Sequence, residues 1–398
     1  MLSTYITEKL LGLKGVIIKN VEEQDGVTQI TIALARKAHR CPCCEKETDI
    51  VHDYRLQPVK DIPAFGNQVV LFYHKRRYRC KACGKCFCEK NTFLPRYHRM
   101  TNRLSAYVIH RLRETCSFTS IAKQVNLSVS TVIRIFDLVQ YGKPQLGNVV
   151  AIDEFKGNTT NEKYQCILTD PENGRVLDIL PNRYMHNLAA YFKDLDRSNT
   201  SFVVSDMWQP YADIFNTYFK NATHVLDRYH VIRQVVWAFE AVRKEEQKRF
   251  SKSHRRYFKR SKSLLIKCFD FLSDEQKQQV NVMLYSSPNL SSAYYFKEAF
   301  FKVTKIKDAV LLRQELSSWV LNAQNSTLPR FRQCANTFTN WGPQMINAFT
   351  CTYSNGFTEG CNNKIKVLKR NAYGFRNFNR FRNRILHVFN RQKAAMPA

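Results

Sequence analysis

The stretch Asn148-Val-Val-Ala-Ile-Asp-Glu-Phe155 carries two acids in an apolar run of the length of a buried β-strand. Successive side chains of a strand point to opposite faces, so Asp153 and Glu154 cannot both serve one site. Asp153 shares its face with Val149 and Ala151, which can pack it into the interior of a layer. The stretch therefore predicts a sheet with a carboxylate on its inner face.

The residues around this strand predict the rest of the sheet. Helical patterns lie near 187–197 and 208–219, and further strand-like runs occupy 164–169, 175–180, 201–206 and 222–227. Three successive strands can pair as a meander, and later strands that alternate with helices suggest parallel additions. This order fits a ribonuclease-H-like layer. The mostly helical pattern of about 228–345 then predicts a large insertion.

Two further acids lie at comparable places. Asp206 ends the apolar run Ser201-Phe-Val-Val-Ser-Asp206, and Glu359 follows the turn Ser354-Asn-Gly356 at the head of a basic helix. Open α/β sheets bind ligands at strand ends, and three carboxylates suit two divalent metals, Mg²⁺ or Mn²⁺, in phosphoryl transfer. We therefore predict Asp153, Asp206 and Glu359 as catalytic metal ligands. Spacing alone leaves other acids as alternatives: Glu154, Asp213 and Asp227.

The helix that follows Glu359 is strongly basic. Helical spacing places Asn363, Lys366 and Arg370 on the face of Glu359, and no acid occurs from Gly360 to the end of the chain. We predict that these three side chains contact DNA phosphates. A solvated basic face would explain the charge but not the acid at its head.

The composition supports an anionic partner. The 398 residues include 62 Lys and Arg against 33 Asp and Glu, a net charge of +29, which nucleic acid can balance. We find no apolar run near 18 residues and no secretory leader, so we expect no membrane partner and a cytoplasmic location, associated with the nucleoid if the chain is bacterial. Clustered cysteines at two-residue gaps indicate metal ligands in a reduced compartment rather than disulfides.

Two Cys-x-x-Cys motifs predict one structural zinc ion. Cys41-Pro-Cys-Cys44 and Cys80-Lys-Ala-Cys83 can each present two thiolates to a tetrahedral Zn²⁺, with Cys41, Cys44, Cys80 and Cys83 as the ligands. Accidental clustering or a redox pair is the alternative. Neighbouring donors leave the ligand set ambiguous: Cys43, His52, Cys86 and Cys88.

Residues 118–135 have the apolar spacing of a helix-turn-helix. The expected inter-helix core consists of Ile121, Val125, Leu127, Val132 and Ile135. Ser128 is the expected N-cap, Asn126 tolerates the left-handed turn, and three side chains face a DNA groove or phosphates: Ser130, Thr131 and Arg134. The alternative is an ordinary helical hairpin. A second basic stretch, 243–263, could follow a DNA backbone or be a solvated helix face with pairing to Glu245 and Glu246.

Long motifs resemble a known family. They are Ala151-Ile-Asp-Glu-Phe155, Val204-Ser-Asp206, Leu226-Asp-Arg-Tyr-His-Val231 and the run from Ser354 through Glu359 to Phe375. These segments, the cysteine motifs and the helix-turn-helix resemble bacterial insertion-sequence transposases of the ISL3 type over nearly the whole chain. The resemblance implies a DDE transposase whose catalytic acids fall on Asp153, Asp206 and Glu359.

The resemblance also implies a role beside the active site for Asp227 and His230, the Asp-x-x-His element of insertion-bearing transposases. From its chemistry, His230 could orient water or phosphate, or cap the strand-to-helix junction.

We therefore expect a multidomain α+β and α/β chain, in which a ribonuclease-H-like catalytic core is interrupted by a large α-helical insertion. The expected parts are a zinc-binding module at 1–100, a helix-turn-helix at 101–140, the first part of the core at 148–230, the insertion at 231–345 and the second part of the core, with the Glu-bearing basic helix, at 346–398. The implied activity is metal-dependent strand cleavage and strand transfer at the terminal inverted repeats of an insertion sequence. The implied partners are double-stranded DNA and further copies of the chain, as a homodimer or a larger assembly. The alternative function is a DNA-binding regulator whose C-terminal region is not catalytic.

Overall fold

The computed structural model describes residues 11–159 and 162–390. The chain divides into two compact units, one made of residues up to 141 and from 366 onward, the other of residues 142–365. The outer ends of the predicted parts 1–100 and 346–398, residues 1–10 and 391–398, lie outside the described residues.

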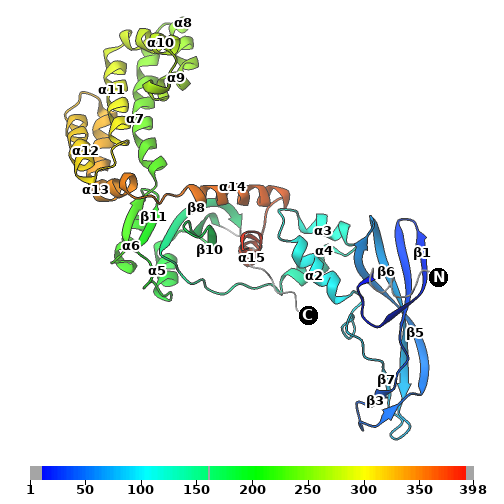
Figure 1. The fold of residues 1–398 in the computed structure, drawn as a ribbon. Coiled ribbons are helices and arrows are strands. Elements are labelled where there is room, and N and C mark those ends of the chain that lie inside the picture. The colour runs from blue at the N-terminus through cyan, green and yellow to red at the C-terminus, as the bar shows by residue number, and fades with distance from the viewer. Residues whose placement is uncertain (1–10, 160–161, 391–398) are drawn as a thin grey trace. The chain divides into compact units, whose positions relative to one another are not determined.

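The N-terminal part of the first unit consists of β-strands, as the alternating pattern of its sequence predicts (Figure 1). The main sheet has the order β1-β2-β6-β5, β7 pairs with β6, and β3 and β4 form a separate ribbon. Its core includes Val16, Ile32, Leu71 and Tyr73. The strands are β1 (Val16–Gln24), β2 (Val27–Leu34), β3 (His39–Arg40), β4 (Glu47–Thr48), β5 (Val51–Ala64), β6 (Asn67–Arg79) and β7 (Cys86–Cys88).

Three short helices follow, and they confirm the predicted helical segment. They are α2 (Asn102–Arg111), α3 (Phe118–Gln124) and α4 (Val129–Phe136). Four of the five predicted core residues are buried and Leu127 is partly buried. Ser128 caps α4 by accepting a hydrogen bond from the backbone N–H of Thr131 at 3.2 Å, and Asn126 has the expected positive φ of 51°.

The C-terminal helix α15 (Phe378–Phe389) packs against this helical segment. The guanidinium of Arg384 is buried and donates to the carbonyls of Glu114 and Cys116 at 2.7 and 2.9 Å. The Nε2 of His387 lies 2.7 Å from the carbonyl oxygen of Ile109. Residues 378–389 therefore belong to the first unit, whereas the sequence led us to expect that 346–398 as a whole returns to the catalytic layer.

The second unit contains a five-stranded mixed sheet of order β10-β9-β8-β11-β12. The first three strands along the chain pair antiparallel, and β11 and β12 are parallel to β8, as the strand and helix pattern predicts. The strands are β8 (Val149–Thr159), β9 (Glu162–Asp170), β10 (Arg175–Leu180), β11 (Phe202–Ser205) and β12 (Thr223–Leu226), and helices α5 (Met185–Lys193) and α6 (Gln209–Tyr218) cover one apolar face of the sheet.

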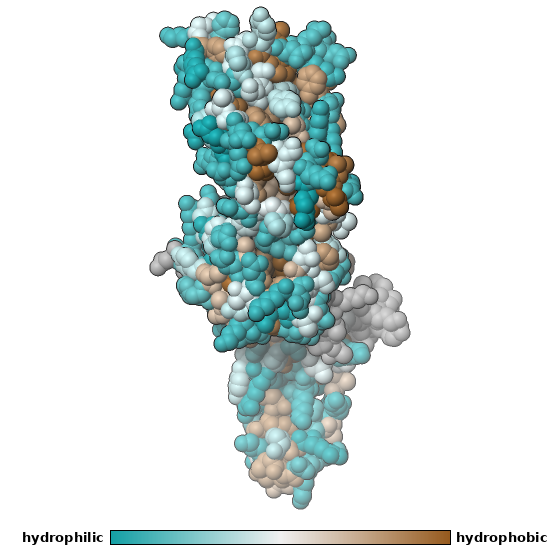
Figure 2. All heavy atoms as spheres, turned by 90° about the vertical axis from the view of Figure 1, so that its left-hand side faces the viewer, coloured by the Kyte–Doolittle hydropathy of each residue, from teal (hydrophilic) through white to brown (hydrophobic). Residues whose placement is uncertain are grey.

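A helical segment follows β12 and leads away from the sheet through α7 (Figure 1). Its elements are α7 (Arg228–Arg249), α8 (Lys252–Arg260), α9 (Lys262–Ile266), the short helix η1 (Phe269–Phe271), α10 (Asp274–Tyr285), α11 (Pro288–Val303), α12 (Ala309–Gln324) and α13 (Pro329–Thr350). These helices share one apolar core, which reaches Leu226 of the sheet. The residues on the face in Figure 2 are mostly hydrophilic, with small hydrophobic patches between them. No helix among the described residues combines the length and apolar character that crossing a membrane requires.

The basic C-terminal segment, expected as one long helix, is two helices. Helix α14 (Gly356–Asn371) ends before Gly374, which has φ of 96° and donates its N–H to the carbonyl of Lys369 at 2.9 Å. A glycine in the left-handed region just past a helix satisfies its last carbonyls and stops it.

Candidate active site and metal centre

Two neighbouring parallel strands place Asp153 and Asp206 next to each other. Strand β8 pairs with β11 in the register of Ala151 with Val204, and each aspartate lies two residues beyond its member of that pair. Adjacent strands are about 4.8 Å apart. Burial raises the pKa of Asp153 to about 7, and the charge of Asp206 contributes in the same direction. The two carboxylates therefore already interact electrostatically.

His230 lies between two of the acids. Asp227 directly follows the strand β12 and precedes α7, and its Oδ2 is 2.7 Å from Nδ1 of His230. The Nε2 of the same ring is 2.8 Å from Oδ2 of Asp206. Burial lowers the pKa of His230, but its hydrogen bonds to Asp206 and Asp227 outweigh that effect and raise it to about 9. The ligand atoms of these three residues lie within 4.8 Å of one another, so they form one possible metal group.

Two buried oxygens in this region have no hydrogen-bond partner among the described residues, Oδ1 of Asp206 and Oδ1 of Asn362. Asn362 also donates from Nδ2 to Oδ2 of Asp153 at 2.8 Å. A buried polar atom without a partner costs free energy, and oxygen donors are the ligands that Mg²⁺ and Mn²⁺ prefer. The donor set thus fits a hard divalent cation.

Helix α14 carries Glu359 and is fixed to the sheet by its first two turns. Asn355 donates to the carbonyl of Ile152 at 3.3 Å, and the hydroxyls of Thr358 and Thr169 are 2.7 Å apart. Asn362, which touches Asp153, is one turn beyond Glu359 on the same side of the helix. Glu359 itself is exposed and is not in the group of three metal-ligand candidates.

The alternative acid Glu154 has other partners. Its carboxylate accepts from Arg183 at 2.6 Å and from the hydroxyl of Tyr211 at 3.4 Å. It also lines a pocket of about 120 Å³ together with Asp206 and His230. Glu154 is thus near the acids but is neutralised by Arg183.

The sequence reasoning missed Asn362, Asn355 and Thr358, although all three lie within the motif that surrounds Glu359. Their spacing of three, four and seven residues is that of one helix face, and this was the available signal. The predicted DNA contacts Asn363, Lys366 and Arg370 are exposed on the same helix. On α4, Arg134 and Ser130 are exposed, while the hydroxyls of Ser130 and Thr131 lie 3.0 and 2.8 Å from that of Ser128.

Four thiols converge in the first unit. The Sγ atoms of Cys41 and Cys83 are 3.6 Å apart, and those of Cys44 and Cys80 are 3.5 Å apart. All four lie within 4.8 Å of one another, and the other thiols nearby are not in this group. Tetrahedral zinc with Zn–S bonds of about 2.3 Å has sulfur–sulfur separations of about 3.8 Å. The cluster therefore fits a structural zinc ion.

Comparison with known proteins agrees with this arrangement. The model of the ISL3 DDE family, described as transposase, matches residues 150–385, which is more than half of the chain. The chain belongs to the ISL3 transposase family. The helix-turn-helix domain of transposase family ISL3 matches residues 89–139, and the zinc-finger of transposase IS204/IS1001/IS1096/IS1165 matches residues 37–83. This family member is therefore a DDE transposase that binds DNA, with a zinc ribbon whose cysteine cluster supports a structural zinc.

Individual relatives carry the same description. The transposase for insertion sequence element IS1001 of Bordetella parapertussis is 27% identical over 396 residues, which cover 94% of this chain and 96% of the relative. The transposase for insertion sequence element IS1557 of Mycobacterium tuberculosis is 23% identical over 300 residues, 67% of this chain and 66% of the relative. A protein of Lactococcus lactis named ATP-dependent protease is 40% identical over 108 residues, but these are only 27% of this chain. The sequence contains no G-x-x-x-x-G-K-[ST] phosphate-binding loop.

Proposed function

We propose that this ISL3 transposase cleaves DNA at the ends of its insertion sequence and joins the resulting 3′-hydroxyl to target DNA. Asp153, Asp206 and Glu359 are the proposed catalytic acids. The observation that carries this assignment is the bond between Asn362 and Asp153, because it ties the helix of Glu359 to the strand of the first acid across 209 positions of sequence. The three acids come from segments far apart in the sequence, and those segments meet at the sheet: β8 pairs with β11, and α14 and the residue before it bond to β8.

The sheet supports a ribonuclease-H-like core. Three antiparallel strands followed by two parallel strands in the order β10-β9-β8-β11-β12 have the topology expected for that fold, and α7 to α13 form an insertion between the second acid and the third. We therefore propose that the insertion runs from the start of α7 to the end of α13 and that the core lies on either side of it in the sequence.

The proposed acids would hold two divalent metals, Mg²⁺ or Mn²⁺. When bound, such a pair activates the attacking oxygen and stabilises the leaving oxygen of a phosphoryl transfer. The role of the chain is to hold the carboxylates at fixed positions. Asp227 orients the ring of His230, and His230 in turn holds Oδ2 of Asp206, which leaves Oδ1 of Asp206 for a metal.

The first unit is the proposed reader of the terminal inverted repeats. We assign the zinc ligands to Cys41, Cys44, Cys80 and Cys83, and groove or phosphate contacts to Ser130, Thr131 and Arg134 of α4. Because two ends of an element must be joined, we propose a dimer or a larger assembly on DNA.

The test is Mg²⁺- or Mn²⁺-dependent cleavage of a duplex that carries an end of the element. Asp153→Asn, Asp206→Asn and Glu359→Gln should each lower the cleavage rate by more than the roughly 10- to 100-fold typical of losing an outer-shell partner of a metal. The matched control is Asp213→Asn, because Asp213 lies on α6 and bonds to Gln209 at 2.8 Å. If any of the three variants cleaves as well as the control, its assignment is wrong.

A further inference from the structure

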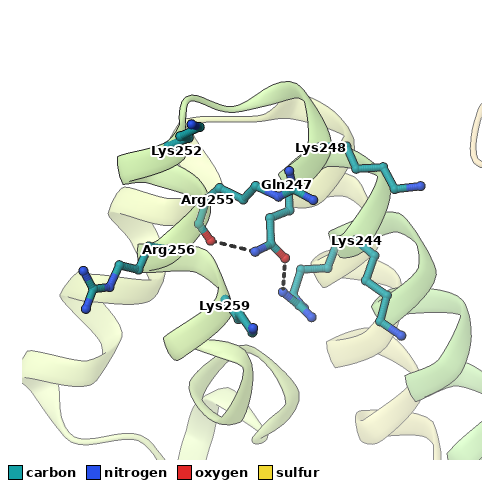
Figure 3. A pocket seen from close by; sticks show the side chains of 8 residues that line it. Lys244, Gln247, Lys248, Lys252, Arg255, Arg256 and Lys259 are labelled. Carbon is teal, nitrogen blue, oxygen red and sulfur yellow. Dashed lines mark hydrogen bonds between the residues drawn. The ribbon is translucent and has the colours of Figure 1, made fainter.

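The C-terminal end of α7 and the helix α8 form a strongly basic pocket, at the end of α7 that lies away from the sheet (Figure 1). It has a volume of about 600 Å³ and is lined by seven cationic residues and one glutamine, with no acid: Arg243, Lys244, Gln247, Lys248, Lys252, Arg255, Arg256 and Lys259. Figure 3 shows the side chains of the two helices around a common space, with Gln247 between the helices.

The two walls of the pocket are held at a fixed spacing. The buried guanidinium of Arg243 donates to both carboxylate oxygens of Glu240, at 2.5 and 3.1 Å, and to Oε1 of Gln247 at 3.0 Å. Gln247 then donates to the backbone carbonyl of Arg255 at 2.6 Å, which links α7 to α8 (Figure 3). The ring of Phe258 stacks on Phe250 at a centroid distance of 4.8 Å beside this link. The pocket is therefore built before any ligand arrives.

The remaining six cations have no counter-charge among the residues that the structure describes. They are exposed, and none of them forms an ion pair within the described part of the chain. The acids nearby are engaged elsewhere: Glu245 pairs with Arg330 at 3.3 Å, and Glu246 with Arg249 at 2.9 Å. The alternative explanation of the basic stretch was a solvated helix face with pairing to these two glutamates. The pairs that form involve Arg249 and Arg330 and none of the six cations. Like charges held close together repel, so a bound polyanion would relieve this repulsion.

We propose that this pocket binds the sugar-phosphate backbone of duplex DNA, without reading its sequence. This inference rests on the proposed function only in taking DNA as the polyanion. Lys and Arg side chains that contact phosphates add affinity and position the duplex but carry no base information. The pocket begins thirteen residues beyond His230 on α7. At a rise of about 1.5 Å per residue this is roughly 20 Å, or about six base pairs of duplex, so the contact lies away from the bond that reacts.

The experiment measures duplex affinity against salt concentration for the full chain, without added divalent metal. The pocket variant is Lys248→Gln, Lys252→Gln and Arg256→Gln together, which leaves the bonds of Arg243 and Gln247 intact. The matched control removes three exposed cations of the same helical segment that do not line this pocket, through Lys302→Gln, Lys307→Gln and Arg313→Gln.

We expect the slope of log affinity against log salt to become shallower by about 2 to 3 in the pocket variant, close to 0.9 for each phosphate that the variant no longer neutralises. The control should keep the slope of the parent chain. The ratio of affinities for duplexes with and without the end sequence should stay the same in the pocket variant. The inference would be overturned if the pocket variant kept the slope of the parent, or if the slope of the control became shallower by the same amount as that of the pocket variant. If the parent chain does not bind DNA at all, the proposed function fails as well.

Discussion

His224 should make the stability of the second unit depend on pH. Its ring is buried on β12, with Nε2 at 2.9 Å from the hydroxyl of Ser205 and ring contacts to Phe215 and Trp341. Its Nδ1 has no partner among the described residues. Burial lowers the pKa of His224 from 6.5 to about 4, because a charged imidazolium would lose its hydration there.

The sign of the effect follows from the direction of this shift. The unfolded chain takes up a proton near pH 6.5, whereas the folded chain resists protonation until about pH 4. The stabilisation is therefore present above pH 6.5 and is lost as the pH falls towards 4. Between pH 7 and pH 5 the free energy of unfolding should fall by roughly 2 kcal/mol through this residue alone.

The assay is urea unfolding followed by tryptophan fluorescence at pH 7 and pH 5. All four tryptophans, at 208, 237, 319 and 341, lie in the second unit, so the signal reports on that unit. His224→Gln keeps a side chain that can bond Ser205 but does not titrate. Between pH 7 and pH 5, the free energy of unfolding of this variant should fall by roughly 2 kcal/mol less than that of the parent. The exposed His186, changed to Gln, is the control and should follow the parent. Equal losses in the parent and His224→Gln would refute the reasoning.

Three further predictions concern the site, the zinc and the helix break. Asn362→Ala should lower metal-dependent cleavage about 10- to 100-fold and leave duplex binding unchanged, because Asn362 holds Asp153 and is not part of the DNA reader in the first unit; an unchanged rate would contradict it. Cys80→Ser should lose the bound zinc and sequence-specific binding, whereas Cys43→Ser keeps both, as atomic absorption and gel-shift titration would report. Gly374→Ala should lower the free energy of unfolding by about 1 to 2 kcal/mol through backbone strain alone, since an added Cβ meets no atom within 4 Å. Gly360→Ala, within the helix α14, should not destabilise the chain, and urea unfolding followed by circular dichroism compares the two variants.

The five-stranded sheet was predictable because its strands are short apolar runs that end at polar residues. The run before Asp153 and the run before Asp206 are buried in the structure, and their parallel pairing follows from the crossover connection through β9, β10 and the helix α5. Local pattern was sufficient here, because burial on both faces demands nearly continuous apolar sequence. The same reasoning located the caps and core of the helix-turn-helix.

Helix α15 shows where local pattern fails. Its Arg384 and His387 belong to a run of basic residues, for which solvent or DNA phosphate is the usual environment. In the structure both side chains are buried and bond backbone carbonyls of the first unit. A basic residue in the sequence can face solvent or can donate to the unpaired carbonyls at a helix end. Which of the two occurs depends on residues distant in the sequence: the carbonyl that Arg384 bonds belongs to Glu114, 270 positions away. Asn362 escaped prediction for a related reason. Helical spacing places it on one face with Asn355 and Thr358, but its role depends on the contact with Asp153, 209 positions away.

Asp153 and Asp206 can bind a metal and still keep the hydrogen bonds that hold them in this structure. Asp206 uses Oδ2 for His230 and has Oδ1 buried and unpaired, so a metal ligand bond and the bond to His230 do not compete for the same oxygen. Asp153 differs, because Oδ1 accepts from the backbone N–H of Glu154 at 2.7 Å and Oδ2 accepts from Asn362. An oxygen of a carboxylate has two lone-pair positions, so Asp153 can bind a metal while it keeps both hydrogen bonds. The two hydrogen bonds and the His230 pair would then fix the orientation of the carboxylates before the metal binds, which lowers the entropy lost on binding and makes Asn362 and His230 positioning residues of the same kind.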